Sequence, residues 1–133
     1  MFAKKNKGAA TAGQIDSLIG RGTRIEGHVV FSGGLRVDGE IVGRVLAEPG
    51  APSTLVLSEH GRIEGEVRVG HLIVNGCIDG PVTVSEFLEM QPKARINGDV
   101  SYAMIEIQQG AVVEGRLLLH PQAAPEPSPE KTD

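Results

Sequence analysis

A short block of sequence recurs along this chain, and the repeat constrains the fold more than any other feature. The block Arg-Ile-Glu-Gly-His-Val at residues 24–29 returns as Arg-Ile-Glu-Gly-Glu-Val at 62–67, as Arg-Ile-Asn-Gly-Asp-Val at 95–100, and more loosely at 113–117. A second block at 35–45, which contains Val-Asp-Gly-Glu-Ile-Val-Gly, is matched at 72–82. Units that repeat in this way usually stack on their neighbours into one continuous core. We therefore expect a solenoid.

One glycine from each unit measures the period. Successive glycines are 16, 22, 15, 18 and 17 residues apart, so the period is about 17. The long interval contains Glu-Pro-Gly-Ala-Pro-Ser at residues 48–53, a composition typical of a loop inserted at one corner. The glycines predicted to form the structural corners are Gly27, Gly43, Gly65, Gly80, Gly98 and Gly115.

Within each unit, apolar residues such as Ile25 and Val29 alternate with polar ones such as Glu26 and His28, which indicates strands with one buried face. Glycines in phase with this alternation allow sharp bends, about three per unit. We therefore predict an all-β parallel β-helix with three short strands per turn, stacked ~4.8 Å apart. Its core should contain fully buried aliphatic ladders, each side chain contributing ~1.5–3 kcal/mol. One such ladder is Ile25, Ile63, Ile96 and Val113.

Composition supports one core flanked by two arms. The 133 residues are 40% hydrophobic but only 3% aromatic, which fits a single domain built on Val, Ile and Leu. Residues 1–14 and the proline-rich residues 121–133 offer little to bury, so both are predicted to be disordered. The β-helix is expected to occupy residues 15–120.

Several functional classes are disfavoured by the sequence. The only cysteine, Cys77, excludes an intrachain disulfide and suits a reducing compartment. No run approaches the ~18 apolar residues of a membrane span, and the first residues do not resemble a signal peptide, so a cytoplasmic location is expected. The net charge is −4 and no basic stripe with aromatic residues is present, so no nucleic-acid partner is predicted.

Residues that could serve chemistry are scattered. The four histidines lack a cysteine or a second histidine at metal-ligand spacing, and the acidic residues beside corner glycines lack the dense Gly-Gly-x-Gly-x-Asp pattern of calcium-binding repeats. No phosphate-loop motif is present. We therefore predict solvent-facing roles for these side chains, no cofactor, and no catalytic or metal site. They are His28, His60, His71, His120, Asp38, Glu40, Asp79 and Asp99.

With these blocks, the sequence resembles the bactofilins, a family of bacterial polymer-forming cytoskeletal proteins. The resemblance covers about residues 15–119 and includes Ile-Gly-Arg-Gly-Thr-Arg-Ile-Glu-Gly at 19–27, Phe-Ser-Gly-Gly-Leu-Arg-Val-Asp-Gly at 31–39 and Gly-Ala-Val-Val-Glu-Gly at 110–115. It implies a right-handed β-helix of about six windings. It also implies non-polar filaments that form without nucleotide and often attach to the inner membrane through a short N-terminal segment. The inserted loop at 48–53 departs from this pattern.

The N-terminal segment fits such an attachment. An aromatic ring beside three lysines could enter an anionic membrane, at about 1 kcal/mol for each lysine, although a merely solvated terminus is the alternative. The predicted membrane-targeting residues are Met1, Phe2, Lys4, Lys5 and Lys7.

The two ends of a β-helix expose unpaired backbone groups and an uncovered apolar cross-section. Solenoids usually cap these ends, and neither arm contains a helical pattern. Uncapped ends would allow the chain to polymerise with itself, although the leucines could instead pack inside the last turn. The predicted interface residues are Ile15, Leu18, Ile19, Leu117, Leu118 and Leu119.

Two other functions remain open from the sequence. The first is a trimeric β-helical acyltransferase or metal-dependent hydratase with active sites between protomers. The second is a monomeric adaptor whose proline-rich tail, residues 121–129, binds a client protein.

Overall fold

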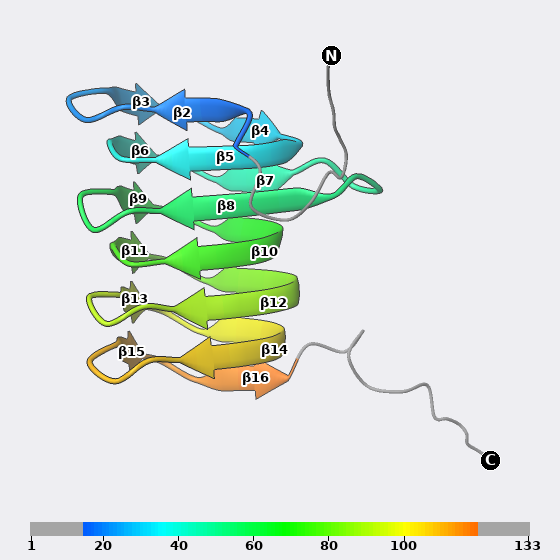
Figure 1. Ribbon diagram of the computed structural model, residues 1–133, viewed down its shortest axis with the longest axis vertical. Coiled ribbons are helices and arrows are strands. Elements are labelled where there is room, and N and C mark those ends of the chain that lie inside the picture. Colours follow the sequence, from blue (N-terminus) through cyan, green and yellow to red (C-terminus); the bar gives the residue numbers. More distant parts are fainter. Residues whose placement is uncertain (1–14, 120–133) are drawn as a thin grey trace.

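The computed structural model describes residues 15–119, which form a stack of parallel β-strands with no helix in that range. The strands lie in layers along one long axis, as in a β-solenoid of about six turns (Figure 1). The predicted all-β parallel helix is therefore confirmed. The expectations for residues 1–14 and 120–133 lie outside the described part of the chain.

Each turn of the solenoid has three sides. The first side is a six-stranded sheet of short strands. Its strands are β3 (Arg24–Glu26), β6 (Glu40–Val42), β9 (Arg62–Glu64), β11 (Cys77–Asp79), β13 (Arg95–Asn97) and β15 (Val112–Glu114). Its central residues form one ladder in parallel register: Ile25, Ile41, Ile63, Ile78, Ile96 and Val113.

The second and third sides belong to one nine-stranded sheet. The second side contains β4 (Val29–Phe31), β7 (Val45–Ala47) and β16 (Leu117–Leu119), and the third contains β2 (Ser17–Ile19), β5 (Gly33–Val37) and β8 (Ser53–Leu57). Three long strands run along both sides: β10 (Val67–Val74), β12 (Val82–Met90) and β14 (Val100–Ile107). Strand β10, for example, pairs with β7 near its start and with β8 near its end.

These long strands correct the prediction of three short strands separated by three glycine corners. The edge between the second and third sides carries Gly33 and Gly70 in two turns but Ser85 and Glu86 in another. The register shifts at this edge between β10 and β12. A bulged strand can turn this corner without a break, so glycine is not required in every turn.

The core is complete only in the middle of the rod. Ile63 and Ile96 are almost completely buried, as predicted. Ile25 and Val113, at the two ends of the same ladder, are only partly buried, because no further layer of the described chain covers them. The expectation of full burial therefore fails at the end turns, for the geometric reason that a stack has a first and a last layer.

The glycine after each first-side strand lies where the backbones of successive turns come closest. Gly43, Gly65, Gly80 and Gly98 have φ between +146° and +150°. A Cβ atom at each would overlap the backbone of the glycine one turn earlier. This column therefore needs glycine both for its φ and for its space.

The inserted loop is one residue shorter than expected. It ends at Pro52, and Ser53 begins β8 with only 5% exposure. The Gly70 backbone N–H donates to Ser53 Oγ at 2.9 Å, which explains how this hydroxyl can be buried.

Candidate self-association surfaces at the ends of the solenoid

Three strands form the N-terminal end of the rod. Within residues 15–119, β2, β3 and β4 each pair with a strand on one edge only. Their other edges leave alternate backbone N–H and C=O groups available to a further strand. Figure 1 shows these three strands as the first layer of the stack.

Side chains at this end point in two directions. Ile19 aligns with the fully buried Val37, so it belongs to the inner face, and Leu18 aligns with the exposed Arg36, so it belongs to the outer face. Leu18 is 60% exposed. The prediction grouped these residues as one patch, whereas the structure places Ile19 over the core and Leu18 on the outer surface. Ile15 is also exposed and precedes β2.

The C-terminal end has the same construction. Its outer strands are β15, β16 and the last part of β14 (residues 104–107). Within the described chain, no later strand pairs with any of them. Leu117 aligns with the buried Val100 and Leu119 with Tyr102, so both continue inner columns. Leu118 aligns with Ser101 on the outer face. All three leucines are exposed, Leu119 by 58%.

Exposed large hydrophobic side chains occur only near these two ends of the described chain. None lies between residues 31 and 103. They are Ile15, Leu18, Val30, Met104, Ile107, Leu117, Leu118 and Leu119. The sequence analysis missed Val30, Met104 and Ile107, which occupy ordinary strand positions and become exposed because their strands are the outermost in the stack.

An ion pair holds the last strand in place. The Arg116 backbone N–H donates to Asp99 Oδ1 at 3.0 Å, and Arg116 Nη2 donates to Asp99 Oδ2 at 2.9 Å. These hydrogen bonds, first from the side chain and then from the backbone, lower the pKa of Asp99 below its ordinary value. The turn that leads into β16 is thus attached to the preceding turn.

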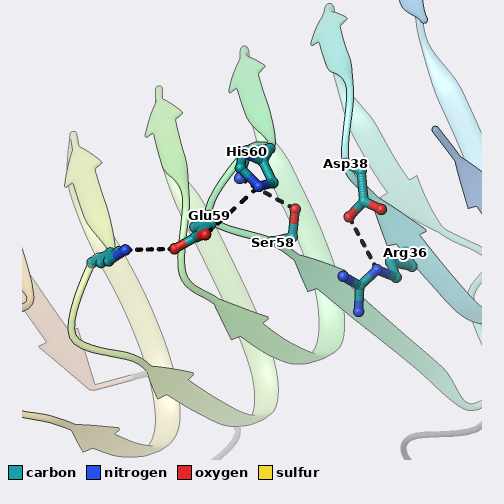
Figure 2. Close-up of polar contacts among 6 residues, drawn as sticks. Arg36, Asp38, Ser58, Glu59 and His60 are labelled. Carbon is teal, nitrogen blue, oxygen red and sulfur yellow. Dashed lines mark hydrogen bonds and ion pairs between the residues drawn. The ribbon is translucent and has the colours of Figure 1, made fainter. Parts of the chain in front are cut away.

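Polar side chains contact one another at the edge between the third and first sides. Figure 2 shows Arg36 beside Asp38, and His60 beside Ser58 and Glu59. A hydrogen bond from Ser58, followed by the charge and hydrogen bond of Arg36, lowers the pKa of Asp38. Glu59 Oε1 accepts a hydrogen bond at 2.7 Å from Lys93 Nζ, which lies at the same edge two turns further along the rod. Two of these contacts join different turns of the rod: Ser58 to Asp38, and Lys93 to Glu59.

The histidines do not converge. His28 Nδ1 accepts a hydrogen bond from the Arg44 backbone N–H. His60 lies near Glu59, and His71 Nδ1 lies 3.5 Å from Glu86 Oε1. Among residues 15–119, no group of three His, Cys, Asp or Glu side chains could hold a metal ion. His120 lies outside the described residues.

In the part of the chain that the structure describes, no helix has the length and apolar character needed to cross a membrane. The predicted membrane-targeting residues, Met1 to Lys7, lie outside that part.

Comparisons with known proteins agree with this architecture. A family model described as "Bactofilin: Polymer-forming cytoskeletal" matches residues 17–118. Bactofilin BacP of Myxococcus xanthus (strain DK1622) is 30% identical over 91 residues, covering 67% of this chain and 38% of BacP. Bactofilin BacO of the same strain is 22% identical over 102 residues, covering 77% of this chain and 78% of BacO. The chain thus matches well under half the length of BacP. No solved structure gives a significant match.

Proposed function

This chain belongs to the bactofilin family of polymer-forming cytoskeletal proteins, and from that premise we propose that it assembles end to end into non-polar filaments without nucleotide. One observation carries the proposal: the exposed large hydrophobic side chains of the described rod are confined to its two ends. There they coincide with strand edges that have no partner in the described chain. The filaments would serve as a cytoplasmic scaffold.

The physical driving force would be continuation of the core. A second copy stacked on β15 and β16 would cover inner-face residues such as Leu117 and Leu119, at about 25 cal/mol per Å² of apolar surface removed from water. It would also pair the free strand edges. Apolar burial and backbone pairing need neither nucleotide hydrolysis nor a metal ion.

Sedimentation and electron microscopy of the purified protein test this proposal. We expect fibres in buffer that lacks nucleotide and contains EDTA, with an unchanged polymer fraction when ATP or GTP is added. Loss of polymer on adding EDTA would contradict the proposal. Small discs would support the trimeric acyltransferase or hydratase, and single particles the monomeric adaptor.

We also propose that residues 1–14 form an arm that attaches the filament to the anionic inner membrane, and that residues 121–133 form a tail available to client proteins. The support is chemical: Phe2 stands beside Lys4, Lys5 and Lys7, with no acidic residue before Asp16. Each arm would bind weakly, but a filament would present many arms to one surface. Avidity would then make attachment long-lived.

Deleting residues 2–7, or replacing Phe2 with glutamate, should release the filaments from anionic vesicles without preventing assembly, because these residues precede the repeat. Vesicle flotation measures attachment separately from filament pelleting. We expect at least a tenfold loss of floated protein, since several weak contacts per copy disappear together. Ala124→Glu is the matched control, because it adds the same single negative charge as Phe2→Glu but in the opposite arm. Unchanged flotation of the deletion variant would place attachment elsewhere.

A further inference from the structure

An apolar stripe crosses the outer face of the third side. Val56 of β8 aligns with Ile73 of β10, and Phe87 of β12 aligns with Met104 of β14. Ile73 aligns with Glu89, two positions after Phe87, so Ile73 and Phe87 are diagonal neighbours on the same face. These four apolar side chains therefore form one continuous apolar stripe over four adjacent strands.

The apolar stripe does not belong to the core. Met104 is exposed, and Val56, Ile73 and Phe87 are partly buried. None of the four is among the side chains that pack against the core, whereas Leu88, next to Phe87 in sequence, is completely buried. The third side, with β8, β10, β12 and β14 stacked in order, faces the viewer in Figure 1. A contiguous apolar surface of this kind usually marks a binding site.

The apolar stripe begins where the described chain ends. Leu119 pairs with Tyr102 of β14, two positions before Met104. Proline at position 121 lacks the backbone N–H that further pairing with β14 would need. We therefore expect the following segment to leave the sheet beside Met104, at the start of the third side.

The length and composition of this segment fit the apolar stripe. The stripe covers three strand spacings, or roughly 15 Å. Four prolines within residues 121–129 favour the polyproline II conformation, which has three residues per turn and rises ~3.1 Å per residue. Pro121, Ala124 and Pro127 would then share one apolar face that spans roughly 19 Å. Such segments dock on apolar and aromatic surfaces because their conformation is already formed.

The acidic residues beside the apolar stripe face an uncharged part of the tail. Glu89 Oε2 accepts hydrogen bonds from Gln91 Nε2 at 3.3 Å and Gln108 Nε2 at 3.1 Å, so its charge is engaged at the ends of β12 and β14. Glu106 aligns with Glu89 on the outermost strand. The tail nearest to them, residues 121–125, contains only proline, glutamine and alanine.

The opposite end of the apolar stripe is basic. Arg36 aligns with Val56 one strand further toward the N-terminal end, and its side chain is 46% exposed. A tail that follows the stripe in this direction brings Glu130 toward Arg36 after Pro127. The N-terminal arm would have to pass Arg36 with its three lysines, and no acidic residue precedes Asp16. Position and charge therefore both favour the C-terminal tail as the occupant.

We propose that residues 121–127 dock along the apolar stripe of their own chain in the polyproline II conformation, from Met104 toward Val56. The inference goes beyond the proposed function, because it gives the tail a binding site on the rod, and it does not depend on filament formation. A client protein that binds the tail would have to displace it from the rod. Docking would thus regulate the availability of the tail.

Electron paramagnetic resonance tests the docking in the full chain, whatever its state of assembly. All variants carry Cys77→Ser, which removes the only native thiol. A nitroxide spin label at Ala123→Cys, which lies off the proposed docking face, reports the mobility of the tail. We expect an immobilised spectrum from this label and a mobile spectrum from a label at Thr132→Cys, beyond the docked segment.

Phe87→Ser should release the tail, because it removes the largest side chain of the apolar stripe. We expect the ratio of immobilised to mobile label at Ala123→Cys to fall about tenfold. Leu46→Ser is the matched control, since it removes an outer-face apolar side chain from the second side, and its spectrum should not change. Circular dichroism shows whether each variant is folded, and Ile73→Ser replaces Phe87→Ser if that variant is not.

Three results would overturn the inference. A mobile label at Ala123→Cys in the chain with an unaltered stripe would show that the tail is not docked. Equal spectra for Phe87→Ser and Leu46→Ser would show that the tail is held elsewhere. Labelled Phe87→Ser chains mixed with an excess of unlabelled Cys77→Ser chains should keep a mobile label, and immobilisation there would show docking on a neighbouring copy. Sedimentation tests the proposed function separately, so the two proposals can fail independently.

Discussion

Replacing Gly65 with alanine should unfold the middle of the rod or lower its melting temperature by more than 10 °C. The new Cβ would overlap the backbone of Gly43 in the preceding turn, and the φ of +150° is one that residues with a side chain rarely adopt. Strain of this kind costs about 1–3 kcal/mol by itself. Backbone overlap adds to it, because the turns cannot separate without breaking the hydrogen bonds on either side. About 1 kcal/mol corresponds to 4–8 °C in a domain of this size.

The matched control is Gly27→Ala. Gly27 occupies the first position of the same column and has a φ of +136°, but its Cβ would meet nothing within 4 Å. Alanine there should therefore show the conformational strain alone, a loss of about 1–3 kcal/mol. Circular dichroism during thermal unfolding at one protein concentration compares the two variants. If both variants lose the same stability, close packing of the glycine column does not govern the stability of the rod.

The repeat is the reason that the fold could be predicted from the sequence. A column residue such as Ile63 keeps the same neighbours in every layer, so one unit predicts the next. The repeat did not predict contacts that occur in only one turn of the rod. Ser53 was assigned to a loop by its composition, yet its buried hydroxyl accepts the hydrogen bond from Gly70 that this layer needs. The bend at Ser85 was missed because a bulge replaces the glycine.

The candidate surface was harder to predict than the fold. Val30 occupies the same outer-face position as Leu46 in the next turn, and nothing in their local sequence separates them. Val30 is exposed because its strand is the outermost, whereas Leu46 has a strand on each side. The run of leucines at residues 117–119 did predict an interface at the C-terminal end. It could not show that Leu118 faces outward while Leu119 continues an inner column, because that distinction depends on register.

Changing Leu119 to arginine should stop assembly at dimers. Leu119 is 58% exposed on the last described strand, so the folded rod can accommodate arginine there. In a filament whose like ends meet, the same substitution enters the C-terminal junction from both copies. Burying an unpaired charge costs about 3–5 kcal/mol, which weakens that contact by a hundredfold or more. The N-terminal junction contains no Leu119 and should persist.

Gel filtration coupled to light scattering distinguishes the possible assemblies. A non-polar filament predicts a dimer joined through β2, β3 and β4, and adding Leu18→Arg should convert this dimer to a monomer. A head-to-tail filament uses one kind of contact throughout, so Leu119→Arg alone would leave monomers. Thr83→Arg is the control, because it places the same charge on the outer face of the second side, in the middle of the rod. If Leu119→Arg forms filaments as long as those of Thr83→Arg, Leu119 is not part of the interface.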